Sequence, residues 1–242
     1  MNNKGLIGRF LEEAIDLLFP RRCPICDDIL PYKANGVCRE CKDKVVFIED
    51  PFCLKCGKAL SEPKEYCDDC SKRNHRFIQG VSVFDYGSVS DSLFRFKNKG
   101  RTEYAKYYAQ AIVHRRGRWL KHINPDAFIP VPIHSSKMKK RGYNQAEILS
   151  KELTRLTGIP TNTSLVMRSH KTSPLKNLSL KERQNNLKNA FKVNDNDVKL
   201  KTIVIIDDIY TTGSTMDEIS QSILSKFDCK IYFLTLTVGR GI

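Results

Sequence analysis

The sequence predicts an α/β domain with a parallel sheet, preceded by a small cysteine-rich module. Eight of the nine cysteines lie between residues 23 and 70. Beyond them, short and continuously apolar segments alternate with amphipathic helical patterns, which is typical of a parallel sheet covered on both faces. One apolar segment, residues 202–208, ends in two acidic residues and runs into a hydroxyl-rich turn. We therefore expect two domains, residues 1–78 and residues 79–242.

The spacing of apolar residues places the elements in order. The first 19 residues predict an amphipathic helix with five apolar residues on one face, Ile7, Phe10, Leu11, Ala14 and Leu18. In the second domain, strands are expected at 80–86, 126–133, 165–167, 202–208 and 230–238. Helices are expected at 90–120, with a break at Gly100, and at 144–156 and 214–227. The polar segment 168–187 has no clear period and is expected to form a mobile loop.

The charge of the chain is concentrated in one region. Lys and Arg number 41 against 27 Asp and Glu, a formal net charge of +14. Residues 1–80 hold 14 basic and 13 acidic residues, whereas residues 95–188 hold 21 basic and 5 acidic residues. Such a surplus indicates an anionic partner. No apolar run approaches the roughly 20 residues of a membrane span, which excludes an integral membrane protein.

The eight clustered cysteines form four C-x-x-C pairs, and a unit of two pairs occurs twice with an offset of 29–30 residues. Each pair directs two thiolates to one point, so two pairs complete a tetrahedral site, and two structural Zn²⁺ ions are expected. The simplest arrangement has one site of Cys23, Cys26, Cys38 and Cys41 and another of Cys53, Cys56, Cys67 and Cys70. A crossed combination of the pairs remains open at this point.

Two other uses of the cysteines are less favoured. A disulfide framework would need an oxidising compartment, but the N-terminus has neither the uninterrupted apolar core nor the cleavage site of a signal peptide. Four tandem C-x-x-C motifs have no reason to be redox catalysts. We therefore expect a cytoplasmic protein whose zinc module is a structural scaffold that folds with its metal.

The segment DDIYTTGST, residues 207–215, carries the most specific chemistry. An apolar strand delivers Asp207 and Asp208 to its carboxyl end, where ligands of open α/β sheets bind. The turn that follows leads into a helix, and its N–H groups and hydroxyls form a cradle for a phosphate. The neighbouring carboxylates can accept hydrogen bonds from a vicinal diol or hold Mg²⁺. This combination predicts a site for a phosphorylated sugar.

The same segment resembles the phosphoribosyl diphosphate (PRPP) signature of type I phosphoribosyltransferases. The resemblance implies a fold of that type, in which Asp207 and Asp208 hold the ribose hydroxyls. It also implies a 5-phosphate loop made of Thr211, Thr212, Gly213, Ser214 and Thr215. The strand end at residues 131–134 resembles the diphosphate loop of that family; it comprises Val131, Pro132, Ile133 and His134. The resemblance also implies Mg²⁺ beside this loop, bound together with PRPP.

The order of motifs along the chain is similar to that of the ComF (ComFC) late-competence proteins. Cysteine pairs, IPVPIH, RGYNQAEILSKEL, LSLKERQNNLKNAF and IIDDIYTTGST follow one another between about Cys23 and Val238. The resemblance implies a zinc ribbon joined to a phosphoribosyltransferase-like domain and a role in natural transformation. The chain departs from many relatives at 172–175, where T-x-x-Q is replaced by TSPL, so no role of that glutamine carries over.

The cationic surplus exceeds the charge that one PRPP needs, and single-stranded DNA would use the rest. Candidate DNA contacts are Lys137, Lys139, Lys140, Arg141, Arg168 and Lys171. Aromatic residues between the charges could stack on unpaired bases, although their helical spacing also fits a core; they are Phe94, Phe96, Tyr104, Tyr107, Tyr108 and Tyr143. We expect an accessory protein that handles incoming single-stranded DNA and binds PRPP, with a competence helicase or another transformation protein as partner.

Two alternatives belong to other functional classes. The chain could be an active phosphoribosyltransferase that moves ribose 5-phosphate from PRPP to an acceptor that the sequence does not identify. It could instead be a zinc-ribbon adaptor whose second domain has lost its ligand.

Overall fold

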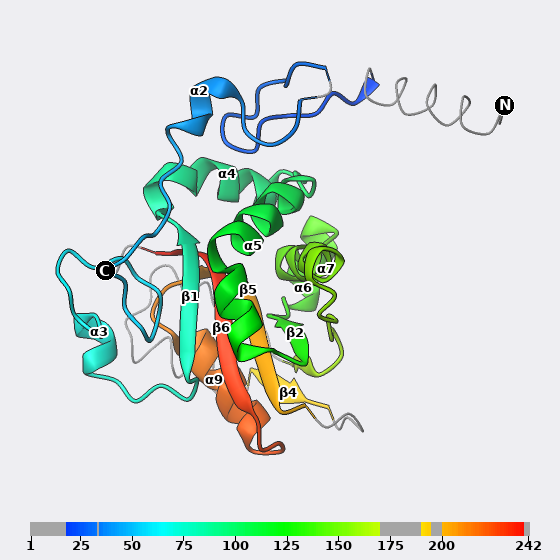
Figure 1. Cartoon of the computed structure of the whole chain (residues 1–242). Helices are drawn as coiled ribbons and strands as arrows, with labels where there is room; N and C mark the ends of the chain where they lie inside the picture. The colour runs from blue at the N-terminus through cyan, green and yellow to red at the C-terminus, as the bar shows by residue number, and fades with distance from the viewer. Residues whose placement is uncertain (1–17, 33, 170–189, 195–199, 240–242) are drawn as a thin grey trace, which may run out of the picture.

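A computed structural model describes residues 18–32, 34–169, 190–194 and 200–239 (Figure 1). The predicted N-terminal helix and most of the polar segment 168–187 fall outside the described residues. The helices are α2 (Arg39–Lys42), α3 (Asp68–Ser71), α4 (Tyr86–Asn98), α5 (Tyr104–Ile123), α6 (Ser135–Arg141), α7 (Gln145–Thr157) and α9 (Ser214–Leu224). The strands are β1 (Gln79–Phe84), β2 (Ala127–Pro130), β3 (Val166–Arg168), β4 (Phe191–Val193), β5 (Thr202–Tyr210) and β6 (Lys230–Val238).

Four strands form a parallel sheet in the order β1-β6-β5-β2. The long apolar strands β5 and β6 lie at its centre, which confirms the prediction of a parallel α/β sheet. The strand expected at 126–133 ends earlier, at Pro130, because a proline has no N–H for a sheet ladder and two prolines occur within three residues. The short strand expected near 165–167 is β3, which pairs with β4 in a separate antiparallel sheet.

Two features of the fold were not predicted. The helix α6 consists of one or two turns of mostly charged residues, which have no apolar period to reveal it. The strand β4 is only three residues long and lies next to residues 170–189, so local sequence carries little signal for it. The helix α6 directly follows the predicted diphosphate loop, and β4 pairs with β3, which carries Arg168.

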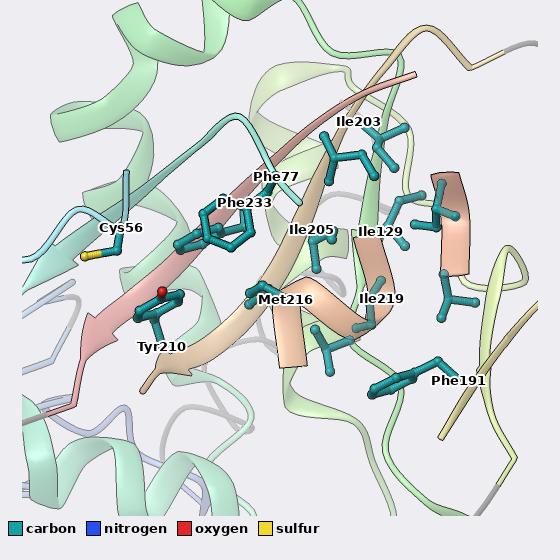
Figure 2. Close-up of a cluster of buried hydrophobic side chains, with 14 of the residues drawn as sticks. Cys56, Phe77, Ile129, Phe191, Ile203, Ile205, Tyr210, Met216, Ile219 and Phe233 are labelled. Atoms are coloured by element: carbon teal, nitrogen blue, oxygen red, sulfur yellow. The ribbon is translucent and has the colours of Figure 1, made fainter. Parts of the chain in front are cut away.

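Alternate residues of β5 face opposite layers, as the period of a strand requires. Val204 and Ile206 pack with residues of α4, α5 and α7. Ile203 and Ile205 pack on the other face with α9 (Figure 2). The continuous apolar strand is therefore explained by burial on both faces.

The second cysteine unit is part of that second layer. Its four cysteines belong to the same buried cluster as residues of β5, β6 and α9. Figure 2 shows Cys56 beside Phe77, Phe233 and Tyr210. Phe77 meets Phe233 edge-on with ring centroids 4.8 Å apart, and Tyr210 stacks on Phe233 at 4.9 Å. The first cysteine unit forms a small cluster of its own instead.

Helices long and apolar enough to cross a membrane are absent from the part of the chain that the structure describes.

Candidate functional site

The carboxyl end of β5 places the two predicted site segments side by side. The strands β2 and β5 pair in parallel register from Ala127 with Ile203 to Pro130 with Ile206. The N–H of Val131 then donates to the carbonyl of Ile206 over 2.9 Å. The loop 131–134 therefore leaves the sheet directly beside Asp207. The chain leaves β2 for α7 on one face of the sheet and leaves β5 for α9 on the other, and ligands of such sheets bind where the connections separate in this way.

The carboxylate pair is strongly coupled to Lys97, which α4 contributes from outside the motif. The Lys97 ammonium lies 2.6 Å from Oδ2 of the buried Asp208. Burial and the neighbouring carboxylate raise the pKa of Asp207 well above its usual range. Burial opposes ionisation of Asp208 too, but the Lys97 charge and hydrogen bond bring the pKa of Asp208 below its ordinary value. The Lys97 ammonium thus stabilises the ionised form of Asp208, whereas burial and the Asp208 charge disfavour ionisation of Asp207.

Three further cations surround this pair. Partial desolvation of its ammonium lowers the pKa of Lys137, and so do the positive charges of Arg168, Arg141 and Lys97, so Lys137 lies within electrostatic range of these three cations. Arg168, which lies over the ring of Phe191, interacts favourably with Asp207, although burial lowers its pKa. Four cations against two carboxyl groups make this end of the sheet a site for an anion.

The phosphate loop is a tight turn between β5 and α9. Gly213 is the N-cap residue of α9 and has φ of 81°, a left-handed conformation that glycine adopts without strain. A Cβ at this position would lie 2.5 Å from the Tyr210 hydroxyl and 2.9 Å from Cε1 of His75, so only glycine fits. Thr212 Oγ1 and Ser214 Oγ are 3.0 Å apart at the start of the helix. Two hydroxyls thus lie together at a helix N-terminus, as in an anion-binding cradle.

Two residues that follow the second cysteine unit contact this loop and the start of α9. Arg73 donates to the carbonyl of Thr212 over 2.6 Å. His75 Nδ1 lies 2.8 Å from Asp217 in the first turn of α9, and the His75 side chain is almost fully buried. Neither residue had a recognisable partner in the sequence, because more than 130 residues separate each from its contact. Only the fold brings them to the loop.

The RGYNQ segment, residues 141–145, connects the elements around the site by hydrogen bonds. Arg141 contacts Gln145 at 3.0 Å and Asn98 at 3.4 Å, and the Tyr143 hydroxyl donates to the carbonyl of Phe96. These bonds fix the end of α4 that carries Lys97. Asn144 caps α7, and its side-chain amide donates to the carbonyl of Val131 over 3.1 Å. The motif therefore ties three elements of the site together.

The other predicted residues divide between site and surface. Val131 is buried, and His134 caps α6 by accepting from the N–H of Ser136. Lys137, Lys139 and Lys140 project from α6 as exposed residues, whereas Arg141 and Arg168 are half-buried near the carboxylates. Lys171 lies outside the described residues. The predicted DNA contacts that the structure describes are thus grouped around one end of the sheet.

The predicted stacking aromatics are mainly core residues. Phe96, Tyr104 and Tyr108 are buried, and Tyr107 and Tyr143 are half-buried. Phe94 is different, because its side chain is 55% exposed on α4. The helical spacing of these residues reflects packing of α4 and α5 on the sheet, and Phe94 alone of these six keeps an open face for stacking.

The carboxyl pair offers few free oxygen ligands for Mg²⁺. Mg²⁺ needs hard oxygen ligands in near-octahedral geometry. Asp208 Oδ2 is engaged by Lys97, and Asp207 Oδ1 accepts the N–H of Asp208 over 2.8 Å. Among the described residues, groups of three or more acidic, histidine or cysteine ligands occur only as the two cysteine clusters. The expectation of Mg²⁺ beside these carboxylates is therefore not supported by the donors present.

The cysteines do fit zinc, in the uncrossed arrangement. Within each cluster, Cys23/Cys26/Cys38/Cys41 and Cys53/Cys56/Cys67/Cys70, the four sulfurs lie within 4.8 Å of one another, and the described cysteines are free thiols. Two S···S distances are 3.8 Å, which is the edge of a tetrahedron with Zn–S bonds of about 2.3 Å. The prediction of two structural Zn²⁺ sites is confirmed.

Comparison with known proteins agrees with this arrangement. A family model described as a double zinc ribbon domain matches residues 14–71. Competence protein F of Haemophilus influenzae is 34% identical over 211 residues, which cover 84% of this chain and 90% of that protein. The DNA utilization protein YhgH of Salmonella typhimurium is 31% identical and covers 86% of this chain and 92% of its own length.

Two more distant likenesses complete the comparison. Competence protein ComFC of Bacillus subtilis is 26% identical over 201 residues, 78% of each chain. Among solved structures, a purine phosphoribosyltransferase from Pyrococcus horikoshii is similar with a TM-score of 0.36 and 15% identity, over 55% of this chain and 73% of that one. The last likeness is too distant to support any conclusion about function.

Proposed function

Because the chain belongs to the ComF family of competence proteins, we propose that it is an accessory factor of natural transformation that binds a phosphoribosyl ligand and single-stranded DNA. It works in the cytoplasm, takes PRPP or a related compound at DDIYTTGST, and handles the incoming strand on its basic surface. A competence helicase or another transformation protein as partner stays a prediction, as does Mg²⁺ carried by the diphosphate of PRPP.

The observation that carries the ligand half is the meeting of a carboxyl pair and a helix N-terminus at one end of the sheet. Asp207 and Asp208 suit the two hydroxyls of a ribose, since each carboxyl group can accept a hydrogen bond from a hydroxyl. The turn into α9 suits the 5-phosphate. Lys137 and Arg168 beside them suit a diphosphate.

The DNA half is supported by exposed charge next to that site. Lys137, Lys139 and Lys140 lie on one short helix, and the exposed ring of Phe94 belongs to the neighbouring α4. Lysines that neutralise phosphates, together with an aromatic face for unpaired bases, are what sequence-independent binding of single strands needs. The names of the relatives, which refer to competence and DNA utilization, agree with such a role.

Calorimetry with PRPP tests the ligand site. We expect saturable binding by the wild type and at least a tenfold loss in Asp207→Asn/Asp208→Asn. The control Asp91→Asn/Asp228→Asn removes the same charge from exposed positions and should bind PRPP like the wild type. Equal binding by both double variants would place the ligand elsewhere, and no binding by any protein would favour the zinc-ribbon adaptor without a ligand.

Fluorescence anisotropy with labelled single-stranded DNA tests the surface. Lys139→Gln/Lys140→Gln should weaken binding and make its salt dependence shallower by a slope of about 1.4, since each lost phosphate contact removes about 0.7. Lys106→Gln/Lys121→Gln removes the same charge from exposed positions on α5 and serves as the control. Identical slopes for the two variants would contradict the assignment of α6 as the DNA surface.

An active phosphoribosyltransferase is the second candidate, and the contact of loop 131–134 with β5 favours it. In that case the C1–diphosphate bond of PRPP breaks, diphosphate leaves with the bonding electron pair, and a nucleophile bonds to C1. Diphosphate release that requires an added amine or base, and that disappears in Asp207→Asn/Asp208→Asn, would establish this activity.

A further inference from the structure

We infer that the Lys97 ammonium takes the place of a divalent cation at the Asp207–Asp208 pair, so that the chain binds 5-phosphorylated ribose without Mg²⁺. This rests on the proposed phosphoribosyl site and names the cation that completes it. The ligand class is a pentose 5-phosphate with a vicinal diol, with or without a diphosphate at C1.

Lys97 is already bonded to the carboxyl pair before any ligand arrives. Its Nζ lies 2.6 Å from Oδ2 of Asp208, which is buried, while the Lys97 side chain is 30% exposed. An ammonium has three N–H donors, and this contact uses one of them. The other two can donate to a ligand oxygen on the exposed part of the side chain. A metal bridging carboxylate and ribose would make the same two kinds of contact.

The lysine is held in place from both sides of α4. Arg95, half a turn away, donates to the carbonyl of Ile25 in the first cysteine unit. At the end of the helix, the Tyr143 hydroxyl bonds to the carbonyl of Phe96. Lys97 is therefore a built part of the site rather than a surface lysine that happens to reach an acid.

The surrounding charge favours an anion over a second cation. The Lys137 ammonium is repelled by Arg141 and Lys97, and this repulsion lowers the pKa of Lys137 in addition to the effect of burial. A Mg²⁺ at the same place would add two charges where two carboxyl groups already face four cations, and it would have to displace the Lys97–Asp208 ion pair. A phosphate or diphosphate would instead offset the existing surplus.

The test is calorimetry with ribose 5-phosphate, which lacks the diphosphate that would itself carry Mg²⁺. For the wild type we expect the same Kd, within about twofold, in Mg²⁺-free buffer without chelator and in millimolar Mg²⁺, with zinc content unchanged. For Lys97→Met we expect at least a tenfold weaker Kd without Mg²⁺, and a large part of that loss should return when Mg²⁺ is added. Lys97→Arg retains the charge and should stay close to the wild type without Mg²⁺.

Binding of Mn²⁺ alone, followed by electron paramagnetic resonance, provides a readout without the sugar. Lys97→Met should bind Mn²⁺ more tightly than the wild type, because the variant leaves both carboxylates available. Wild-type binding of ribose 5-phosphate that appears only with Mg²⁺ overturns the inference, even if Lys97→Met fails to fold. Absence of ribose 5-phosphate binding both with and without metal overturns the proposed site instead, so the two failures are distinguishable.

Discussion

The two cysteine units descend from one pattern but differ at the residue that follows their first C-x-x-C pair. This residue has a positive φ in both units: 70° at Asp27 and 73° at Gly57. In the first unit the Asp27 carboxylate bonds to Arg101 and to the Tyr104 hydroxyl, so a side chain attaches the unit to the helical layer. In the second unit the missing side chain lets the turn touch β1 directly.

The first cysteine unit is thus attached to the sheet domain by side-chain contacts, whereas the second unit is part of the core of that domain. Two thiols of the first unit, Cys26 and Cys38, are half-buried and the unit forms a separate cluster, whereas all four thiols of the second unit are buried with the sheet. Each unit reaches one half of the ligand site. The first contacts α4, which carries Lys97, and the second contacts the phosphate loop through Arg73.

Loss of zinc separates the units most strongly. Cys53→Ser/Cys56→Ser should abolish the cooperative thermal transition, because a structural zinc site contributes about 10 kcal/mol or more and total stability is only about 5–15 kcal/mol. Cys23→Ser/Cys26→Ser should lose one zinc, by elemental analysis, but keep a cooperative transition of the sheet domain. Equal loss of the transition in both variants would mean that the first unit is as integral as the second.

Close backbone approach is the next test of this difference. A Cβ at Gly57 would lie 2.6 Å from the N of Ser82 and 2.8 Å from Cα of Val81. Gly57→Ala should therefore cost about 3 kcal/mol in the free energy of unfolding by urea, from left-handed strain plus displacement of β1. Gly36→Ala in the first unit has the same sign of φ but open space around it and should cost about 1 kcal/mol. A cost at Gly57 no larger than at Gly36 would rule out the contact with β1 as its cause.

The sheet and the metal sites are the parts of the molecule that could be predicted from the sequence. The alternation of apolar strands predicted the sheet, and cysteine spacing predicted both metal sites, because each depends on a local period or spacing. Asp207 and Asp208 were expected to end a strand; they lie in the last part of β5, which continues two residues further, to Tyr210. Local signals carry that much.

The remaining parts of the site depend on contacts that no local pattern encodes. Lys97 reads as one more basic residue on an amphipathic helix, and its partner Asp208 is 111 residues away. Likewise, nothing near Arg73 or His75 points to the phosphate loop. The sequence also suggested a module beside a domain, whereas the second cysteine unit shares its core with the sheet.

The attachment of the first unit should depend on the charge of Asp27. Burial opposes ionisation, but hydrogen bonds from Tyr104 and Arg101 lower the pKa of Asp27 below its ordinary value. A carboxylate with a depressed pKa stabilises the fold above its unfolded pKa, and that contribution is lost as pH falls through the folded pKa. Asp27→Asn, which keeps the left-handed preference, should lower stability by about 1–2 kcal/mol at neutral pH.

Urea unfolding at several pH values measures that contribution. The difference between wild type and Asp27→Asn should be constant from neutral pH down to about pH 5 and should shrink below about pH 4. Both proteins lose zinc in acid together, so the difference between them is the relevant quantity. Tyr104→Phe should destabilise Asp27→Asn by less than it destabilises the wild type, since both residues act in one contact.

The smallest expected effect concerns the link from the second unit to the phosphate loop. Arg73→Gln removes a charged donor from the carbonyl of Thr212, so the loop should lose part of its preorganisation and bind ribose 5-phosphate about fivefold more weakly, or about 1 kcal/mol. Lys72→Gln removes the same charge from the exposed neighbouring position and should leave the affinity unchanged. Calorimetry measures both, and zinc content should remain at the wild-type level in each. If the two variants bind alike, the second unit supports the sheet without setting the shape of the phosphate loop.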